Sequence, residues 1–201
     1  MDIVAVSGKL RTDVGKRASA QIRREGGIPC VMYDAKNVIH FTTEIKEVKK
    51  LIYTPKFKLA EVSIDGKTYT CIIKEYQMHP VTDAVTHIDF LHLLEGQDVK
   101  IEVPVKFVGT SPGVKGGGKL LQMLRRVKLK TTVEHLIDEV TLDISDLKLG
   151  QSIRIRDIQP NEGVEIMNNG ATPVAIVEIP RALRSAQSAA EGEEVAEAVA
   201  E

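Results

Sequence analysis

The chain has 201 residues, 43% of them apolar, with 4% aromatic residues, no Trp and a formal net charge of −1. This length exceeds the usual size of a single domain, and the scarcity of aromatic residues favours a strand-rich core of Val, Ile and Leu. Cys30 and Cys71 lack CxxC spacing, so we expect both cysteines to be reduced. No apolar run approaches about 18 residues and the N-terminus lacks a signal-peptide pattern, so we expect a cytoplasmic protein that does not span a membrane.

The first elements predicted are a strand, a helix and a second strand. We expect a strand over Ile3–Leu10, with Ile3, Ala5 and Leu10 facing inward. A helix follows over roughly 15–25, and Gly26 and Gly27 end it. Pro29 excludes helix, so residues 30–33 resume a strand.

The next segments predict a helix and a hairpin. Residues 43–52 have one apolar face, and Thr42 or Thr43 is the expected N-cap. Residues 62–64 and 67–74 flank Asp65 and Gly66, a pair typical of a two-residue hairpin turn. Residues 87–94 form a further strand.

The character of the sequence changes near residue 94, where we place a domain boundary. Residues 95–180 form a second domain of strands at about 101–107, 127–133, 139–144, 152–156 and 174–179, with a glycine-rich loop over 110–119. Pro104 predicts that the first of these strands lies at a sheet edge. Residues 181–201 are rich in Ala and Glu, which indicates a disordered acidic tail.

Positive charge is concentrated in the N-terminal part of the chain. The balance of Lys and Arg against Asp and Glu is +3 over residues 1–94, −1 over 95–180 and −3 over 181–201. Six cations fall within residues 9–24, opposed only by Asp13: Lys9, Arg11, Lys16, Arg17, Arg23 and Arg24. Thus a nearly neutral chain can present a strongly basic face.

The predicted first helix arranges part of this charge on one face. Lys16, Ser19 and Arg23 are spaced i, i+3, i+7, whereas Ala18 and Ile22 lie on a different face suited to packing against a sheet. Several cations with a hydroxyl between them, held on rigid elements, suit phosphate recognition. A solvated helix face explains the same pattern equally well.

Two further patterns resemble catalytic or metal-binding motifs. Gly113 to Lys119 nearly matches the phosphate-binding G-x-x-x-x-G-K-[ST] motif, but Leu120 lacks the hydroxyl that would hold Mg²⁺, so a glycine loop that packs against a neighbour is the better interpretation.

His79, His87, Asp89 and His92 form the second such pattern. His87 and Asp89 are two residues apart and share a strand face, but no nucleophile or further ligand completes an enzyme or metal site. A His–Asp pair that binds a ligand, or whose members hydrogen-bond to each other, fits better. We therefore expect no catalytic residues, no metal and no cofactor.

Two blocks of sequence resemble the bacterial ribosomal protein L25 family. The first runs from Gly8 through Lys16 and Ser19 to Tyr33, and the second comprises residues 77–80 and 87–90. The likeness continues through residues 108–114 and 149–153, which are similar to the second domain of the long form of the family, the general stress or CTC type. It covers about residues 5–180, and the two N-terminal blocks together are specific.

The resemblance implies a mainly β (α+β) protein. Its N-terminal domain would be an antiparallel six-stranded β-barrel with helices, bound to 5S rRNA in the large ribosomal subunit. A second β-rich domain would meet neighbouring ribosomal proteins through residues 95–180. The matching positions imply these RNA-binding residues: Lys9, Arg11, Lys16, Ser19, Arg23, Tyr33, Gln77, His87 and Asp89.

The sequence departs from the family pattern at two positions. Ala20 stands where several relatives have a basic residue, so one phosphate contact is lost. Asp34 follows Tyr33 where glycine is usual, so a carboxylate lies near the proposed RNA-binding surface. Asp89 itself either accepts a hydrogen bond from a base amine or only orients His87.

Two functions other than RNA binding stay open at this stage. The chain could be a translation-linked stress or adaptor protein that acts mainly through its second domain and acidic tail. It could also be a hydrolase or nucleotide-dependent enzyme, which ligand-induced stabilisation would reveal. The basic residues Arg125, Arg126, Lys128 and Lys130 form an outward strip that either meets a partner or is a solvated sheet face.

Overall fold

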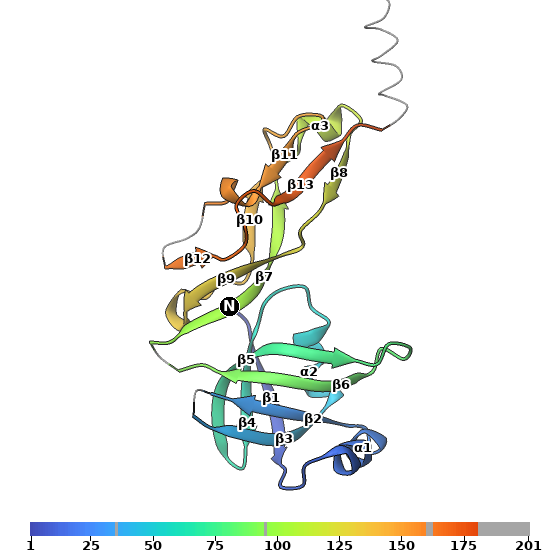
Figure 1. The fold of residues 1–201 in the computed structure, drawn as a ribbon, viewed down its shortest axis with the longest axis vertical. Helices are drawn as coiled ribbons and strands as arrows, with labels where there is room; N and C mark the ends of the chain where they lie inside the picture. The colour runs from blue at the N-terminus through green and yellow to red at the C-terminus, as the bar shows by residue number, and fades with distance from the viewer. Residues whose placement is uncertain (35, 95, 160–162, 181–201) are drawn as a thin grey trace, which may run out of the picture. The chain divides into compact units, whose positions relative to one another are not determined.

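A computed structural model describes residues 1–34, 36–94, 96–159 and 163–180 (Figure 1). The predicted tail, residues 181–201, lies outside the described residues. Up to residue 94 the elements are β1 (Ile3–Leu10), α1 (Lys16–Arg24), β2 (Gly27–Tyr33), β3 (Val38–Glu44), α2 (Ile45–Ile52), β4 (Leu59–Ile64), β5 (Lys67–Met78) and β6 (Val85–His92). The chain is mainly β, as the sequence predicts.

The six N-terminal strands form a closed barrel in the order β1-β3-β2-β6-β5-β4. The expectation of an antiparallel barrel is wrong in part, because β1 pairs with β4 and β2 pairs with β6 in parallel. A short turn can join only antiparallel strands, whereas parallel strands need a long connection between them. Several other elements lie between β1 and β4, and between β2 and β6, so the chain can return in the same direction. A parallel β2–β6 pair places the first and last thirds of the barrel sequence side by side.

The barrel core is built from inward-facing apolar side chains. Phe41 and Phe90 are fully buried, with ring centroids 5.5 Å apart. In β1 the buried residue is Val6, whereas Ile3 is 62% exposed, so the predicted inward set of Ile3, Ala5 and Leu10 is wrong. Val4, Val6 and Gly8 face inward, and Gly8 leaves room for Phe41: a Cβ added at Gly8 would lie 2.6 Å from Phe41 Cδ2.

Helix α1 matches its predicted bounds within about one residue. The helix ends at Glu25, Gly26 has φ +84°, and the Gly26 N–H donates to the Arg23 carbonyl. Glycine adopts this left-handed conformation without the strain that a Cβ would cause. The helix therefore stops where the sequence predicts, and β2 begins at Gly27.

Strand β3 replaces the predicted start of the second helix. Thr43 is buried in β3, where its hydroxyl donates to the Ser7 carbonyl at 2.8 Å, so neither Thr42 nor Thr43 caps α2, and Glu44 precedes the helix. Two elements share this segment: a period-2 pattern ends at Glu44 and a helical pattern begins at Ile45. Val48 and Ile52 of α2 are buried in the barrel core.

The predicted hairpin is confirmed. Strands β4 and β5 pair in antiparallel orientation up to Ile64 and Lys67, and the turn residues Asp65 and Gly66 have φ of 48° and 78°. Strand β5 continues beyond the predicted end, to Met78, and pairs with β6 on its other side through two irregularities in register. This long strand carries Gln77 to the end of the barrel where His87 lies.

After residue 94 the elements are β7 (Asp98–Val108), α3 (Pro112–Lys115), β8 (Lys119–Gln122), β9 (Arg126–Thr132), a 3₁₀ turn (Val133–His135), β10 (Val140–Asp143), β11 (Ser152–Arg154), a 3₁₀ turn (Ile155–Asp157), β12 (Val164–Ile166) and β13 (Pro173–Glu178). They form a four-stranded sheet, β10-β7-β9-β12, and a three-stranded sheet, β11-β13-β8. The predicted strands are present, and β8 and β12 were not predicted.

The prediction that Pro104 marks an edge strand is wrong, because β7 lies between β10 and β9. Strand β10 pairs with β7 only from Val105 onward. Pro104 therefore precedes the paired stretch, and its missing N–H removes no ladder hydrogen bond on that side.

The compact units of the chain do not follow a single cut in the sequence. The first unit contains Met1–Pro104 and Lys128–Glu139, and most other described residues after Pro104 belong to the second. The strands β7 and β9 each contribute residues to both units. The domain boundary at residue 94 therefore stays a prediction. The last strand of the barrel, β6, ends at His92.

Candidate RNA-binding surface

Strand register brings the predicted polar residues of β5 and β6 together on the outside of the barrel. His87 lies opposite Gln77, and Asp89 lies opposite Glu75 on one side and Val31 on the other. Residues directly opposite in neighbouring strands point to the same face. Because Ile88 and Phe90 between and beyond them are buried, His87 and Asp89 point outward. We call this face of β2, β6 and β5 the outer wall.

His87 and Asp89 interact directly. His87 Nδ1 lies 2.6 Å from Asp89 Oδ1, and the two side chains are 26% and 33% exposed. This confirms that they share a face and hydrogen-bond to each other. The contact fixes the ring so that Nε2, which has no partner in the described part of the chain, points away from Asp89.

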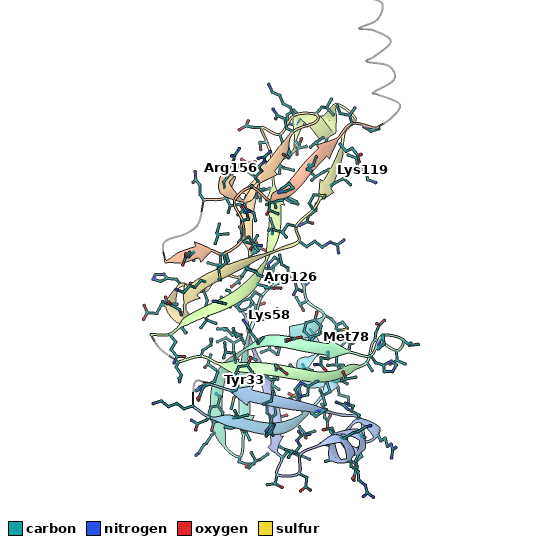
Figure 2. All side chains as sticks on the ribbon, in the orientation of Figure 1. Tyr33, Lys58, Met78, Lys119, Arg126 and Arg156 are labelled. Carbon is teal, nitrogen blue, oxygen red and sulfur yellow. The ribbon has the colours of Figure 1, made fainter. Side chains whose placement is uncertain are left out.

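Tyr33 lies close to the same carboxylates. Burial, then the charge of Asp89, then that of Glu75 raise the pKa of the Tyr33 phenol. The phenol therefore stays protonated well above neutral pH and remains a hydrogen-bond donor. Figure 2 labels Tyr33 on the barrel, at the end of β2.

Arg11 connects the first strand to α1. Its backbone N–H donates to the His40 carbonyl at 3.0 Å, and Arg11 Nη1 donates to Ser19 Oγ at 3.3 Å. Arg11 Nε is buried and has no hydrogen-bond partner among the described residues. Burial raises the pKa of the Cys30 thiol, the positive charge of Arg11 lowers it, and the carboxylate of Asp89 raises it, so the thiol lies within electrostatic range of both side chains.

Helix α1 packs against β2 on the outside of the barrel (Figure 1). Arg23 of α1 forms a hydrogen bond to β6. Arg23 Nε donates to the Thr86 carbonyl at 2.9 Å, and the Thr86 hydroxyl donates to the Gln77 carbonyl at 3.1 Å. The sequence predicts that Ile22 packs against the sheet, and Ile22 Cγ2 would lie 3.0 Å from a Cβ added at Gly27 of β2. Glycine at residue 27 therefore permits this close approach.

The predicted residues thus fall into two groups. Hydrogen bonds, the His–Asp contact or strand register connect seven of them to other elements: Arg11, Ser19, Arg23, Tyr33, Gln77, His87 and Asp89. Lys9 and Lys16 are exposed, and the described part of the chain gives neither an ion pair. Lys9 lies opposite Thr42, beside the part of the wall that α1 covers.

Asp34 has a local structural role. Its Oδ1 accepts from the backbone N–H groups of Lys36 and Asn37 at 2.7 and 2.8 Å, and His92 Nδ1 lies 3.5 Å from Oδ2. The hydrogen bond from Lys36, then that from Asn37, lower the pKa of Asp34. The carboxylate is therefore occupied in closing the turn between β2 and β3, as short polar side chains often are.

His40 and Glu75 belong to this surface, although neither was predicted. His40 lies opposite Val31, which lies opposite Asp89, so all three occupy one row across the wall. The alternation of buried Phe41 and Thr43 with His40 and Thr42 is a strand signal that could have identified His40. Glu75 depends on a register irregularity in β5 that no sequence pattern indicates.

The glycine loop over 113–119 is explained by packing. A Cβ at Gly113 would lie 2.7 Å from the Leu149 backbone nitrogen, and one at Gly118 would lie 2.5 Å from Val177 Cγ1. These glycines allow close chain contacts, as the sequence interpretation favours. The described residues contain no group of three or more His, Cys, Asp or Glu arranged to hold a metal ion, and no described helix is long and apolar enough to cross a membrane.

The two lysines of the basic strip lie on β9 and pair with acidic residues of β7. Lys130 Nζ lies 2.9 Å from Asp98 Oδ2 and Lys128 Nζ lies 3.7 Å from Glu102 Oε1, both on β7. Cross-strand pairs of opposite charge stabilise a sheet face. This favours the solvated-face interpretation for these two lysines.

The fold and the surface define a small β-barrel protein whose polar residues gather outside the wall, beside a basic helix. The sequence model of the ribosomal L25p family matches residues 6–90, and that of the C-terminal domain of ribosomal protein TL5 matches residues 98–181. The chain belongs to the ribosomal L25p family, with a second domain of the TL5 type.

Curated relatives match over nearly the whole chain. The large ribosomal subunit protein bL25 of Phocaeicola vulgatus is 34% identical over 197 residues, which cover 94% of this chain and 99% of that protein. The bL25 protein of Cytophaga hutchinsonii is 37% identical over 94% of this chain and 98% of its own length. The bL25 protein of Porphyromonas gingivalis is 38% identical over 92% of this chain and 97% of its own length. This is a family of ribosomal proteins, not of enzymes.

Proposed function

We propose that this protein is a structural component of the large ribosomal subunit and binds 5S rRNA through α1 and the outer wall. The observation that supports this most is the chain of contacts from Arg11 through Ser19 on α1 and from Arg23 to β6, beside the His87–Asp89 pair. These contacts hold cations, donors and one oriented imidazole on rigid elements.

The chemistry of this surface suits an irregular RNA stem. Regular A-form RNA has a deep, narrow major groove that side chains do not enter, so a distorted helix with a wider groove is the expected target. Lys16, Arg17 and Arg24 are exposed on α1 and supply phosphate contacts. Gln77 and the oriented His87 ring supply groups for base edges or 2′-hydroxyls.

Asp89 has a definite role in this proposal despite its charge. Its carboxylate accepts from His87 Nδ1, so the imidazole tautomer that presents Nε2 to RNA is fixed. The second oxygen of Asp89 can accept from a base amine. Both roles offset the repulsion between a carboxylate and a polyanion.

The second domain, residues 95–180, meets neighbouring ribosomal proteins in this proposal, and residues 1–94 form the RNA-binding domain. The two family matches end at residue 90 and begin at residue 98, on either side of the proposed boundary. The balance of +3 over residues 1–94 supports an RNA-binding role for the barrel.

The test is a gel shift of the purified protein with total ribosomal RNA, followed by identification of the retained species. We expect 5S rRNA, with an affinity whose logarithm falls linearly with the logarithm of salt concentration, by roughly 0.7–0.9 for each phosphate neutralised. Lys16→Gln should lower that slope by about one phosphate, whereas Lys67→Gln, in the β4–β5 turn, should not. Retention of another RNA, or of none, contradicts the proposal.

A further inference from the structure

A second cationic surface lies on α2, away from the outer wall. Three lysines and one tyrosine are spaced i, i+3, i+4, i+7 along this helix, and all four are exposed: Lys46, Lys49, Lys50 and Tyr53. We call them the α2 stripe. The Tyr53 N–H donates to the Lys49 carbonyl, so Tyr53 continues the helical geometry, and its side chain is 53% exposed.

The stripe faces away from the barrel. Val48 is fully buried in the barrel core, and helical geometry places residues 46 and 50 about 200° from residue 48. The helix sits where β1 and β3 separate, since these strands pair only at Lys9 and Leu10. The Glu47 carboxylate accepts from the Ser7 N–H at 3.4 Å, which holds α2 at this opening.

Among the described residues, the lysines of the stripe have no paired counter-charge. In the part of the chain that the structure describes, none of the three forms an ion pair, and Glu47 is directed toward β1. Like charges spaced i, i+4, such as Lys46 and Lys50, destabilise a helix by a few tenths of a kcal/mol. An external polyanion would remove this repulsion.

The exposed aromatic ring at the end of the stripe favours a nucleic acid over a protein surface. A half-exposed tyrosine beside lysines can stack on an unpaired base while the ammonium groups contact phosphates. Three lysines and a tyrosine span about 10 Å of helix, at a rise of 1.5 Å for each residue. That length covers roughly two phosphates of one strand.

The stripe and the outer wall face different directions. In a closed six-stranded barrel each strand occupies about 60° of the circumference, and β2 and β3 lie between β6 and the opening that α2 fills. His87 and Asp89 therefore face more than about 120° away from the stripe. One straight stem on the outer wall does not reach it.

We infer that the α2 stripe binds a second RNA segment of the large ribosomal subunit, outside 5S rRNA, so that the barrel bridges two RNAs. This inference rests on the proposed function, because it requires the protein to be assembled in the subunit. It assigns α2 a role in assembly that the outer wall does not supply.

The test compares two binding measurements on one variant. The triple variant Lys46→Gln, Lys49→Gln, Lys50→Gln of the full chain is titrated with isolated 5S rRNA and with large subunits that lack this protein. We expect unchanged 5S rRNA affinity. For subunits, the slope of log affinity against log salt should fall by about 1.4–1.8, at roughly 0.7–0.9 for each of two lost phosphate contacts.

The matched control removes the same charge elsewhere. Lys67 lies in the barrel, is exposed, and has no ion pair among the described residues. The single variant Lys67→Gln is compared with the single stripe variant Lys50→Gln: Lys67→Gln should keep the parent slope on subunits, whereas Lys50→Gln should lower it by roughly 0.7–0.9. An equal fall in the control would show an effect of net charge and overturn the inference.

Three other results would also overturn it. They are an equal loss on isolated 5S rRNA, no loss on either target, and a loss on subunits that does not vary with salt, which would indicate a protein neighbour. If the parent protein binds subunits but not 5S rRNA, the proposed function fails, while the subunit measurement still decides the role of the stripe.

Discussion

Asp89→Asn gives a test in which two explanations predict opposite signs. If Asp89 is only a carboxylate near a polyanion, its neutralisation should strengthen RNA binding. If its contact with His87 orients the ring for RNA, the same change should weaken binding. The isosteric amide preserves shape, so the sign of the change separates electrostatic repulsion from positioning.

The magnitudes favour weakening. A hydrogen bond to a charged group contributes about 1.5–3 kcal/mol, and the 2.6 Å contact between His87 and Asp89 is of this kind. Because both side chains are about a third exposed or less, solvent screening reduces this value. The repulsion relieved is about 1 kcal/mol or less at the surface in salt. The net loss is about 0.5–2 kcal/mol, or roughly two- to thirtyfold in affinity.

Filter binding to 5S rRNA at constant salt measures this loss. The control is Glu75→Gln, which removes the carboxylate directly opposite Asp89, and for which the structure shows no histidine partner among the described residues. Glu75→Gln should leave affinity unchanged or raise it slightly. An increase in affinity for Asp89→Asn similar to that of the control would refute the positioning argument.

A spectroscopic titration checks the geometry independently of RNA. Since Asp89 raises the pKa of the Tyr33 phenol, Asp89→Asn should lower that pKa toward its ordinary value. The pKa should stay partly raised, because burial is the larger cause. An unchanged tyrosine titration would show that Asp89 and Tyr33 are not neighbours in solution.

Three further predictions concern packing, thiol reactivity and domain structure. Gly113→Ala should destabilise the protein by about 1–3 kcal/mol, because the added Cβ would lie 2.7 Å from backbone atoms of residues 148 and 149. Gly116→Ala, whose added Cβ would have its nearest contact at 3.4 Å, should be nearly neutral. The melting temperatures of the two variants measure the difference, and equal effects would contradict the packing explanation. Burial raises the pKa of the Cys71 thiol to about 12. The thiol should therefore be unreactive to alkylating reagents at pH 8 in the native protein and become reactive in urea. Mass spectrometry measures the labelling, and rapid labelling of the native protein would show that the thiol is not buried. Residues 1–94 alone should fold, as judged by circular dichroism, and keep 5S rRNA affinity within about threefold, on the same salt dependence; a folded fragment without affinity would place the RNA-binding role elsewhere.

Local sequence signals predicted much of the fold because their causes are local. The end of α1 follows from the conformational freedom of Gly26, and the β4–β5 turn follows from Asp65 and Gly66. The pairing of His87 with Asp89 follows from the alternation of side chains along one strand. These features depend on few residues close in the chain, so one sequence is enough to predict them.

Other features required tertiary structure. The inward face of β1 depends on Gly8 making room for Phe41, which is more than thirty residues away, and so the sequence suggested the wrong face. Strand β3 was not predicted because Thr43 resembles a helix cap, whereas its hydroxyl donates to the Ser7 carbonyl on the neighbouring strand β1. The parallel pairing of β2 with β6 likewise depends on how distant strands assemble.

The sequence by itself determined which residues carry charge, where α1 ends and where the β4–β5 turn lies. The tertiary structure decided which of those residues meet: Arg23 reaches β6, Asp34 closes a turn, and the lysines of β9 pair with β7, whereas those of α2 form no ion pair with a described residue. The physical reason is that a period along the chain fixes only the direction of a side chain relative to its own element. Its neighbours are set by strand order and register, which the packing of the whole barrel selects.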